Sequence, residues 1–185
     1  MNDQSQSEST SAVYWDPIVS LKYEHQMALQ RLEAIERTLQ YLETLPKGMV
    51  PEKRKVEQSR LREGVLSLEQ GMDLHFHKEE DALFPVLAKY IGKEHGPIEV
   101  MLDEHEQLRL ILSDWKKCVC ELCKRSGPER EPVLRTVTTA GYEAIRLLRL
   151  HIKKENQILF EICEASLSPE EKRAVARKIK TLGVG

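Results

Sequence analysis

The sequence has no excess of positive charge, no long apolar run and no alternating pattern typical of β-strands. Its 28 Lys and Arg are balanced by 30 Asp and Glu, and the net charge of -2 argues against binding to nucleic acid or anionic lipid. With 31% charged and 41% hydrophobic residues, the chain is too polar for a membrane protein and too apolar for a disordered one. We therefore expect a soluble globular protein with no nucleic-acid partner and no membrane partner.

Cysteine is also scarce, and the chain does not open on a basic, apolar leader. MNDQSQSEST is polar and acidic, so residues 1–13 are predicted to be a disordered N-terminal tail rather than a signal peptide. Four Cys in 185 residues favour reduced thiols over a disulfide framework, and we expect a cytoplasmic protein. Cys118, Cys120 and Cys123 stand close together without a fourth ligand nearby, which favours partly buried thiols over a redox or second metal motif.

Apolar residues recur at three- and four-residue spacing in four long segments, which predicts four amphipathic helices. Gly and Pro residues at 46–51, 92–97 and 127–132 separate the segments. The predicted fold class is all-α, an up-down-up-down four-helix bundle over residues 14–165. The predicted core positions are Ile18, Leu21, His25, Ala28, Leu32, Ile35, Leu39 and Leu42; Leu61, Val65, Leu68, Met72, His75, Glu79, Ala82 and Val86; Ile98, Met101, His105, Leu108, Leu112, Trp115, Val119 and Leu122; and Leu134, Val137, Gly141, Ala144, Leu148, His151, Glu155, Ile158 and Ile162.

A short extra C-terminal helix is predicted within residues 166–185. Ser168-Pro169-Glu170-Glu171 combines a capping box with Pro at the first helical position. The basic, amphipathic body of this segment predicts a surface helix packed on the bundle.

Polar residues interrupt each of the four seams at a single level. In each antiparallel pair of helices, the two interruptions lie at similar distances from the connection, so His25 should lie level with His75. The same count places His105 level with His151. The interrupting residues are His25, His75, Glu79, His105, His151 and Glu155.

The same pattern occurs twice along the chain. H-x-x-K-E-x-x-x-L-F begins at His75 and again at His151, and each copy follows an upstream Glu-His pair. This repetition predicts a duplicated αα-hairpin. Two such hairpins would bring four imidazoles and two carboxylates together on the bundle axis.

Six polar groups in a dry core need compensation, and metal ions supply it most simply. His and Glu four residues apart share one helical face, so the two turns suggest two metals bridged by Glu79 and Glu155. These donors supply fewer bonds than the ~12 of two octahedral ions, which leaves positions for solvent, an oxo or hydroxo bridge, or a small exogenous ligand. Zinc and manganese are alternatives, but mixed imidazole and carboxylate donors with open positions suit iron. A ferritin-like site is disfavoured because Glu-x-x-His is absent.

Over roughly residues 18–165 these motifs resemble the hemerythrin-like, or HHE cation-binding, domain family. The resemblance rests on His25, His75-FHK-Glu79-EDALFP, HGPIEVMLDE-His105 and His151-IKK-Glu155-NQILF. It implies a four-helix bundle with a non-haem di-iron centre. The ligand roles it implies fall on His25, His75, Glu79, His105, His151 and Glu155.

Two departures separate the sequence from the oxygen-carrying hemerythrins. Met101 stands where the carriers have a further His, and Glu155 follows His151 by four residues where the carriers have Asp at five. Both argue against dedicated oxygen transport. The motifs look closer to bacterial di-iron proteins that repair iron–sulfur clusters, although the small Cys-containing domain and the extra His in the first helix of those proteins are absent.

The remaining candidates are expected to lie outside the centre. His77 should face solvent, because it lies two residues from His75, and His95 is predicted to be a loop residue rather than a fifth His ligand. Glu24, Glu80 and Glu104 flank ligands and are interpreted either as surface residues or as partners that orient imidazoles. Trp115 and Met72 are predicted core residues.

These observations favour a cytosolic di-iron protein with two non-haem iron ions. Its expected partner is a small ligand, namely dioxygen, nitric oxide or peroxide, in sensing, scavenging or iron supply. One alternative is an enzyme, such as a di-iron peroxidase, a nitric oxide reductase or a cluster-repair catalyst. Another is a structural zinc or metal-storage bundle, and the sequence leaves the oligomeric state open.

Overall fold

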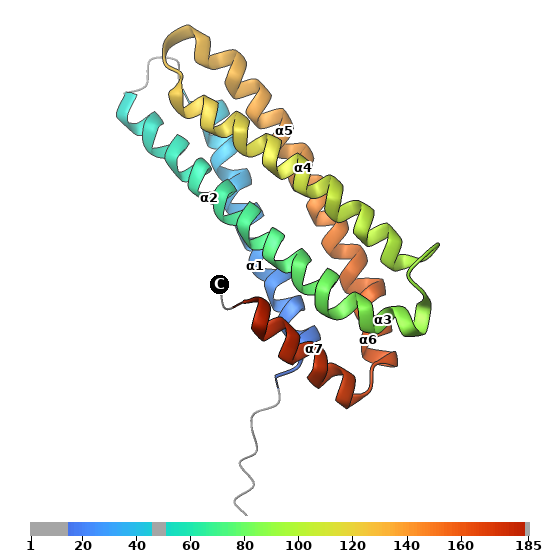
Figure 1. The fold of residues 1–185 in the computed structure, drawn as a ribbon. Helices are drawn as coiled ribbons and strands as arrows, with labels where there is room; N and C mark the ends of the chain where they lie inside the picture. The colour runs from blue at the N-terminus through green and yellow to red at the C-terminus, as the bar shows by residue number, and fades with distance from the viewer. Residues whose placement is uncertain (1–14, 46–50, 184–185) are drawn as a thin grey trace, which may run out of the picture.

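Four long helices form the body of the computed structural model, which describes residues 15–45 and 51–183 (Figure 1). Each long helix packs against two others, in the ring α1, α2, α4, α5, so neighbours along the chain are neighbours in space. There is no β-strand among the described residues. The predicted all-α, up-down-up-down bundle is confirmed. The long helices are α1 (Pro17–Thr44), α2 (Pro51–Lys78), α4 (Pro97–Lys124) and α5 (Arg130–Lys154).

Two of the long helices continue through a single wide turn into a shorter helix. In each wide turn a backbone N–H reaches the carbonyl five residues back, from Phe84 to Glu79 and from Phe160 to Glu155. Such a π turn holds one residue more than a regular helical turn. The elements are η1 (Glu79–Leu83) and α3 (Phe84–Ile91) after α2, and η3 (Glu155–Leu159) and α6 (Phe160–Ser166) after α5; a 3₁₀ turn, η2 (Gly127–Glu129), precedes α5.

Helices begin at the capping residues that the sequence supplies. The Asp16 carboxylate accepts hydrogen bonds from the N–H groups of Ile18, at 2.8 Å, and Val19 at the start of α1. The predicted capping box is present at α7 (Pro169–Leu182), where the Ser168 side chain and the Glu171 backbone and side chain are paired. These side chains satisfy backbone donors that the first helical turn leaves unpaired.

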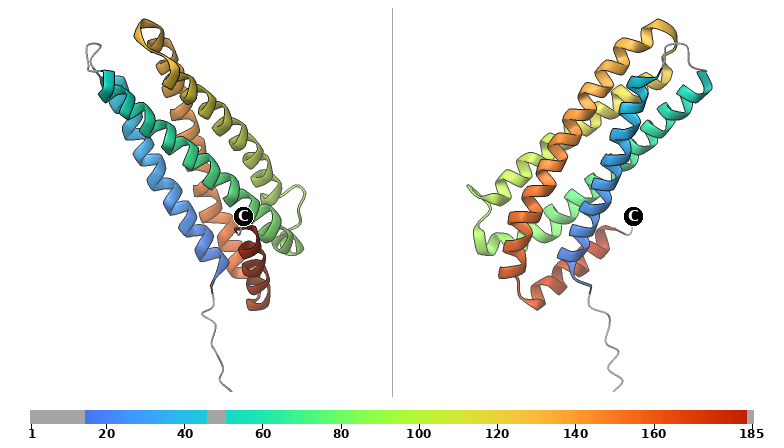
Figure 2. Two further views of the ribbon diagram at one scale, coloured as in Figure 1. Left: turned by 60° about the vertical axis from the view of Figure 1, so that its left-hand side comes forward. Right: turned by 180° about the vertical axis from the view of Figure 1, so that it is seen from behind.

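The last helix, α7, lies across the end of the bundle where α1 begins (Figures 1 and 2). It packs against α1, α2 and η1, and it buries Val175, Ala176 and Ile179. The N-terminal tail predicted at 1–13 and all but the last residue of the break predicted at 46–51 lie outside the described residues. No helix in the described part of the chain is both long and apolar enough to cross a membrane.

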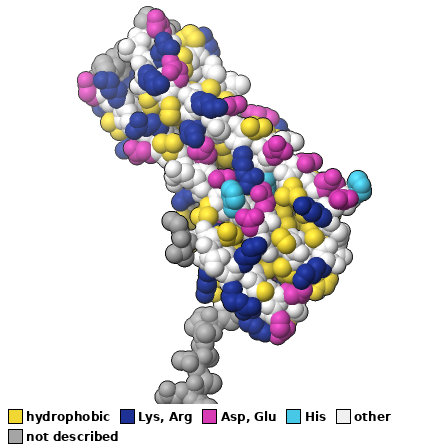
Figure 3. Space-filling model, in the orientation of Figure 1, with side chains coloured by type: hydrophobic (Ala, Val, Ile, Leu, Met, Phe, Trp, Pro, Cys, Tyr) yellow, Lys and Arg dark blue, Asp and Glu magenta, His cyan; other side chains and the backbone are white. Residues whose placement is uncertain are grey.

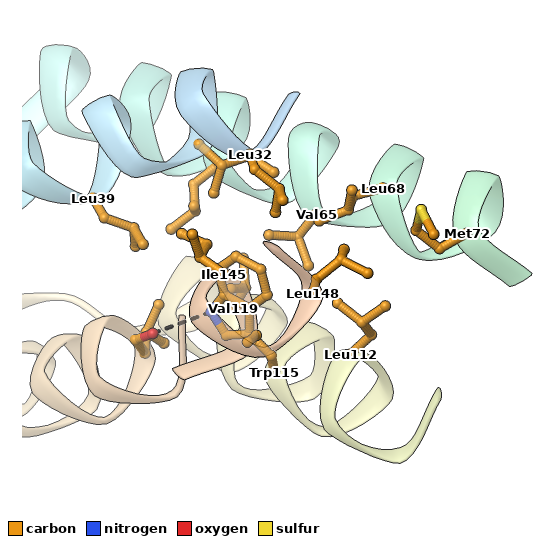
Figure 4. Close-up of a cluster of buried hydrophobic side chains, with 14 of the residues drawn as sticks. Leu32, Leu39, Val65, Leu68, Met72, Leu112, Trp115, Val119, Ile145 and Leu148 are labelled. Atoms are coloured by element: carbon orange, nitrogen blue, oxygen red, sulfur yellow. Dashed lines mark hydrogen bonds between the residues drawn. The ribbon is translucent and has the colours of Figure 1, made fainter. Parts of the chain in front are cut away.

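The apolar core contains Trp115, whose indole is buried between the helices (Figure 4). The indole N–H donates a hydrogen bond of 3.1 Å to the carbonyl of Val137. Gly141 allows this approach, because a Cβ there would lie 2.8 Å from both Trp115 Cζ2 and Leu39 Cδ1. Trp115 and Met72 are core residues, as predicted.

The predicted seams of α1 and α4 are buried throughout, but the seams of α2 and α5 shift by one residue beyond the wide turns. Ile158 is 52% exposed, and Val86 and Ile162 are only half-buried. Their predicted burial is wrong because the extra residue of each π turn rotates the following helix. Leu87, Leu159 and Cys163 take the core positions instead.

Candidate metal centre

The four His and two Glu that interrupt the seams lie together in one buried layer. None of them is more than 2% exposed. Apolar clusters lie on both sides, so that on α1 Leu21 belongs to one cluster and Ala28 to the other. On the face shown in Figure 3 only isolated His side chains are visible, with acidic and basic side chains interspersed. The residues of the layer are His25, His75, Glu79, His105, His151 and Glu155.

The predicted levels of the imidazoles are confirmed. The ring centroids of His25 and His75 are 4.4 Å apart, and those of His105 and His151 are 4.9 Å apart. Antiparallel helices of similar length therefore bring each pair of rings together across the bundle.

Both carboxylates lie among the inward-facing Nε2 atoms of the imidazoles. Glu155 Oε2 is 3.1 Å from His25 Nε2 and 3.2 Å from His151 Nε2, and its Oε1 is 3.5 Å from His105 Nε2. Glu79 Oε1 is 3.4 Å from His75 Nε2, and Glu79 Oε2 is 3.4 Å from His105 Nε2. Each carboxylate thus faces imidazoles from both halves of the chain.

The ligand-type atoms fall into two overlapping groups that could each hold a metal ion. One group consists of His25, His75, Glu79 and Glu155, and the other of His105, His151 and Glu155. Within each group the nitrogen and oxygen atoms lie within 4.8 Å of one another. This spacing is compatible with a shared ion in each group, and Glu155 belongs to both.

Mutual charge stabilises the layer in the absence of a metal. Burial by itself would lower the pKa of His75, but the negative charge of Glu79 and the hydrogen bond to Glu24 raise it to about 10. Burial likewise would lower the pKa of His105, but the carboxylates of Glu155, Glu79 and Glu80 beside it raise it to about 10. Burial would raise the pKa of Glu155, yet the imidazoles that surround it hold it well below the usual range. A cation in this layer would therefore compete with protons on His75 and His105.

The outward-facing Nδ1 atom of each imidazole also has a partner. His75 donates to Glu24 at 3.0 Å, and Lys78 holds the other oxygen of Glu24 at 2.6 Å. His151 donates to Glu104 at 3.0 Å, and Lys154 holds that carboxylate in the same way. These two arrangements repeat between the halves of the chain.

The other two imidazoles have different partners. His105 donates to Glu80 at 2.7 Å, and Arg109 holds both oxygens of Glu80, at 2.9 and 3.0 Å. His25 donates to the amide oxygen of Asn156 at 2.9 Å. Glu24, Glu80 and Glu104 are therefore orienting partners rather than plain surface residues. A fixed Nδ1–H keeps Nε2 available as a ligand.

Every Phe of the chain stands against this layer. Phe76 stacks on His105 with ring centroids 4.0 Å apart, and Phe84 stacks on His105 at 5.7 Å. Phe160 stacks on His25 at 5.3 Å. The sequence contains three Phe, so all of them are used as apolar walls of the same site.

The remaining predicted candidates lie outside the layer. His77 is 50% exposed and bonds to the Asp73 carbonyl, and His95 is 91% exposed in the loop before α4 with φ 58°. Both predictions are confirmed. Cys118, Cys120 and Cys123 are half-buried free thiols, and no Cys belongs to a metal-capable group in the described ranges.

The wide turns begin at the two carboxylates of the layer. Glu79 is the first residue of η1, and Glu155 is the first residue of η3. Single π turns are frequent at functional sites, where they change the direction of a side chain and of the chain after it. The model of the Hemerythrin HHE cation binding domain matches residues 16–163, a span that contains the whole layer. The chain belongs to the hemerythrin family.

As a hemerythrin-family domain, the chain is a cation-binding protein, and its His and Glu groups are compatible with that role. No curated protein matches the chain, so its resemblance to the iron–sulfur cluster repair proteins stays a prediction. Sequence reasoning missed three features of this hemerythrin-like site: the Phe walls, the Arg109 contact and Asn156. The repeat contains a signal for the last of these, because Asn156 occupies the position that Glu80 has in the first half.

Proposed function

We propose that the chain binds two non-haem iron ions in the buried layer and exposes them to dioxygen, nitric oxide or peroxide. The ligands are His25, His75, Glu79, His105, His151 and Glu155. Glu155, which belongs to both ligand groups, would bridge the two positions, and Glu79, which faces His75 and His105, would do the same. A di-iron pair supplies open coordination positions and electrons for small ligands.

One observation carries the proposal: the inward atoms of the layer lack hydrogen-bond partners. The Nε2 atoms of all four imidazoles and all four oxygens of Glu79 and Glu155 are buried and without such a partner. A buried polar atom left unpaired costs about 1–3 kcal/mol, and a charged one costs more. These eight atoms face one another, and bound cations could use all of them as metal ligands.

The donor chemistry favours iron over a purely structural ion. Structural zinc sites are closed and four-coordinate, usually with Cys ligands. Here four nitrogens and two carboxylates serve two positions, which leaves coordination sites for a further ligand.

A surface pocket beside the layer supports access by a small apolar molecule. The pocket has a volume of about 470 Å³ and is lined by Met101 and Leu159 among other residues. Met101 lies one helical turn from His105, and Leu159 lies one turn from Glu155. A small molecule in the pocket would thus be separated from the centre by these two side chains.

The residues of the chain have separate tasks in this function. The partners of Nδ1 hold each imidazole in the tautomer that leaves Nε2 free to bind. The Phe rings exclude water from the layer, which strengthens the electrostatic interactions inside it. Met101 restricts the route by which a small ligand enters.

Anaerobic purification with metal analysis tests the proposal. We expect two irons per chain, and an optical spectrum that changes when dioxygen or nitric oxide is added. Met101→Trp should fill the entry pocket and slow the spectral change, while Leu110→Trp, at an exposed position of α4 that does not line the pocket, serves as the control. One zinc per chain with no spectral response would overturn the proposal.

A further inference from the structure

We propose that the two metal positions are inequivalent, and that the His25 and His75 position binds its metal more weakly because Asn156 stands where the other half has Glu80. This inference rests on the proposed two-metal function. Its basis is a single departure from the repeat. Among the partners of the four imidazole Nδ1 atoms, Asn156 beside His25 differs from its counterpart, Glu80 beside His105.

The repeat otherwise holds closely around the layer. His75 with Glu24 and His151 with Glu104 have the same Nδ1 to carboxylate distance of 3.0 Å. A Lys one turn after each of these His residues holds the second carboxylate oxygen. The difference at Asn156 is therefore specific to one imidazole and is no general loosening of one half.

The ion pair of Glu80 and Arg109 has no counterpart at the corresponding positions of the repeat. Glu80 accepts from His105 and is held on both oxygens by Arg109. In the repeat, Asn156 takes the place of Glu80, and Leu29 takes the place of Arg109. Leu29 packs on the apolar cluster, so it offers no charge to a carboxylate. Beside His25 both members of the ion pair are therefore replaced, and a neutral amide accepts the hydrogen bond of His25.

The group that accepts the hydrogen bond from Nδ1–H affects how strongly the imidazole binds a metal. A carboxylate that accepts from Nδ1–H makes a charge-assisted hydrogen bond and raises the basicity of the imidazole, whereas an amide oxygen does so less. Both imidazoles of the His105 and His151 position have carboxylate partners. Only His75 has one at the other position. Changes to such partners alter metal affinity by about 10- to 100-fold.

The inference also gives the chain a means of iron supply. The His105 and His151 position would fill first and keep its ion. The His25 and His75 position would fill second and release its ion first, to a chelator or to an acceptor protein. A half-loaded chain would then be a stable species rather than a mixture of empty and full chains.

The test is an anaerobic titration of the metal-free full-length chain with ⁵⁷Fe²⁺, followed by calorimetry and Mössbauer spectroscopy. We expect two binding steps that differ about 10- to 100-fold in Kd, with one quadrupole doublet filling before the other. Asn156→Asp supplies a carboxylate of the same size and should tighten the second step about 10-fold or more. Glu80→Gln keeps an acceptor but removes its charge, and it should weaken the first step by a similar factor.

Matched controls separate the hydrogen bond from the charge. Gln157→Glu adds a negative charge at the exposed neighbour of Asn156, and Asp81→Asn removes one at the exposed neighbour of Glu80. Both controls should leave the two Kd values unchanged, and circular dichroism checks that every variant folds. Two irons of equal affinity in the wild type, or Asn156→Asp without effect in a folded chain, would overturn the inference alone. Uptake of fewer than two irons would overturn the proposed function as well.

Discussion

Substitution of Gly141 by Ala tests how tightly the bundle is packed around Trp115. A Cβ at this position would lie 2.8 Å from both Trp115 Cζ2 and Leu39 Cδ1, closer than real Cβ atoms approach their neighbours. Trp115 is buried and its indole N–H is bonded to Val137, so the ring cannot move without loss of a hydrogen bond worth about 1 kcal/mol.

The expected magnitude is the balance of two effects. Ala in place of Gly inside a helix stabilises by about 1 kcal/mol, whereas overpacking of a filled core costs about 1–3 kcal/mol. With the loss of the indole hydrogen bond, we expect Gly141→Ala to lower the free energy of unfolding by about 1–3 kcal/mol. For a chain of this size that corresponds to a Tm about 2–12 °C lower.

Gly71→Ala on α2 is the matched control. An added Cβ there would meet Arg31 Nη1 at 2.9 Å, the movable end of a surface side chain. We expect this variant to gain about 0.5–1 kcal/mol from helix propensity alone. Urea and thermal unfolding measure both values, and metal content should be unchanged in both. If Gly141→Ala stabilised the chain as much as Gly71→Ala does, the packing argument at Trp115 would be refuted.

Three further predictions concern the centre and the last helix. His151→Ala and Glu79→Ala should lose bound metal as measured by elemental analysis, whereas His77→Ala should keep it, and equal loss from His77→Ala would contradict the assigned helix facing. Removal of metal with a chelator should lower the Tm by about 8–16 °C, since binding at 1,000 times Kd contributes about 4 kcal/mol; an unchanged Tm would show that the layer is not a metal site. Ser168→Ala should cost about 1 kcal/mol in urea unfolding through loss of the α7 cap, while Ser166→Ala, just before it, should have little effect.

The sequence predicted the fold and the layer because both depend on regular spacing. The polar residues His25, His75, His105 and His151 stand out against apolar seams, and helix rise alone placed them at one height. Such spacing holds as long as each backbone N–H bonds four residues back. It fails at Glu79 and Glu155, where the bond reaches five residues back, and this failure moved Val86 and Ile158 out of the predicted core.

The contacts around the imidazoles could not be predicted in the same way. Whether Glu24 or Glu80 reaches an Nδ1 atom depends on side-chain rotamers and on which helix face lies opposite, and periodicity specifies neither. Asn156 was visible in the repeat as a departure from Glu80, but only the structure connects that departure with His25. The Phe rings lie beside the seam positions, so apolar spacing alone gave them no place in the predicted core.

The two wide turns mean that this chain contains one spare residue in each half. Without it, the residues before and after each turn would form a single regular seam of the kind that ordinary bundles have. Deletion of one residue inside η1, such as Asp81, would restore that regular helix and keep Leu87 in the core phase, because the narrower turn and the lost residue offset each other. A regular bundle therefore needs neither extra residue, and each extra residue sets the direction of the helix that follows a carboxylate of the layer.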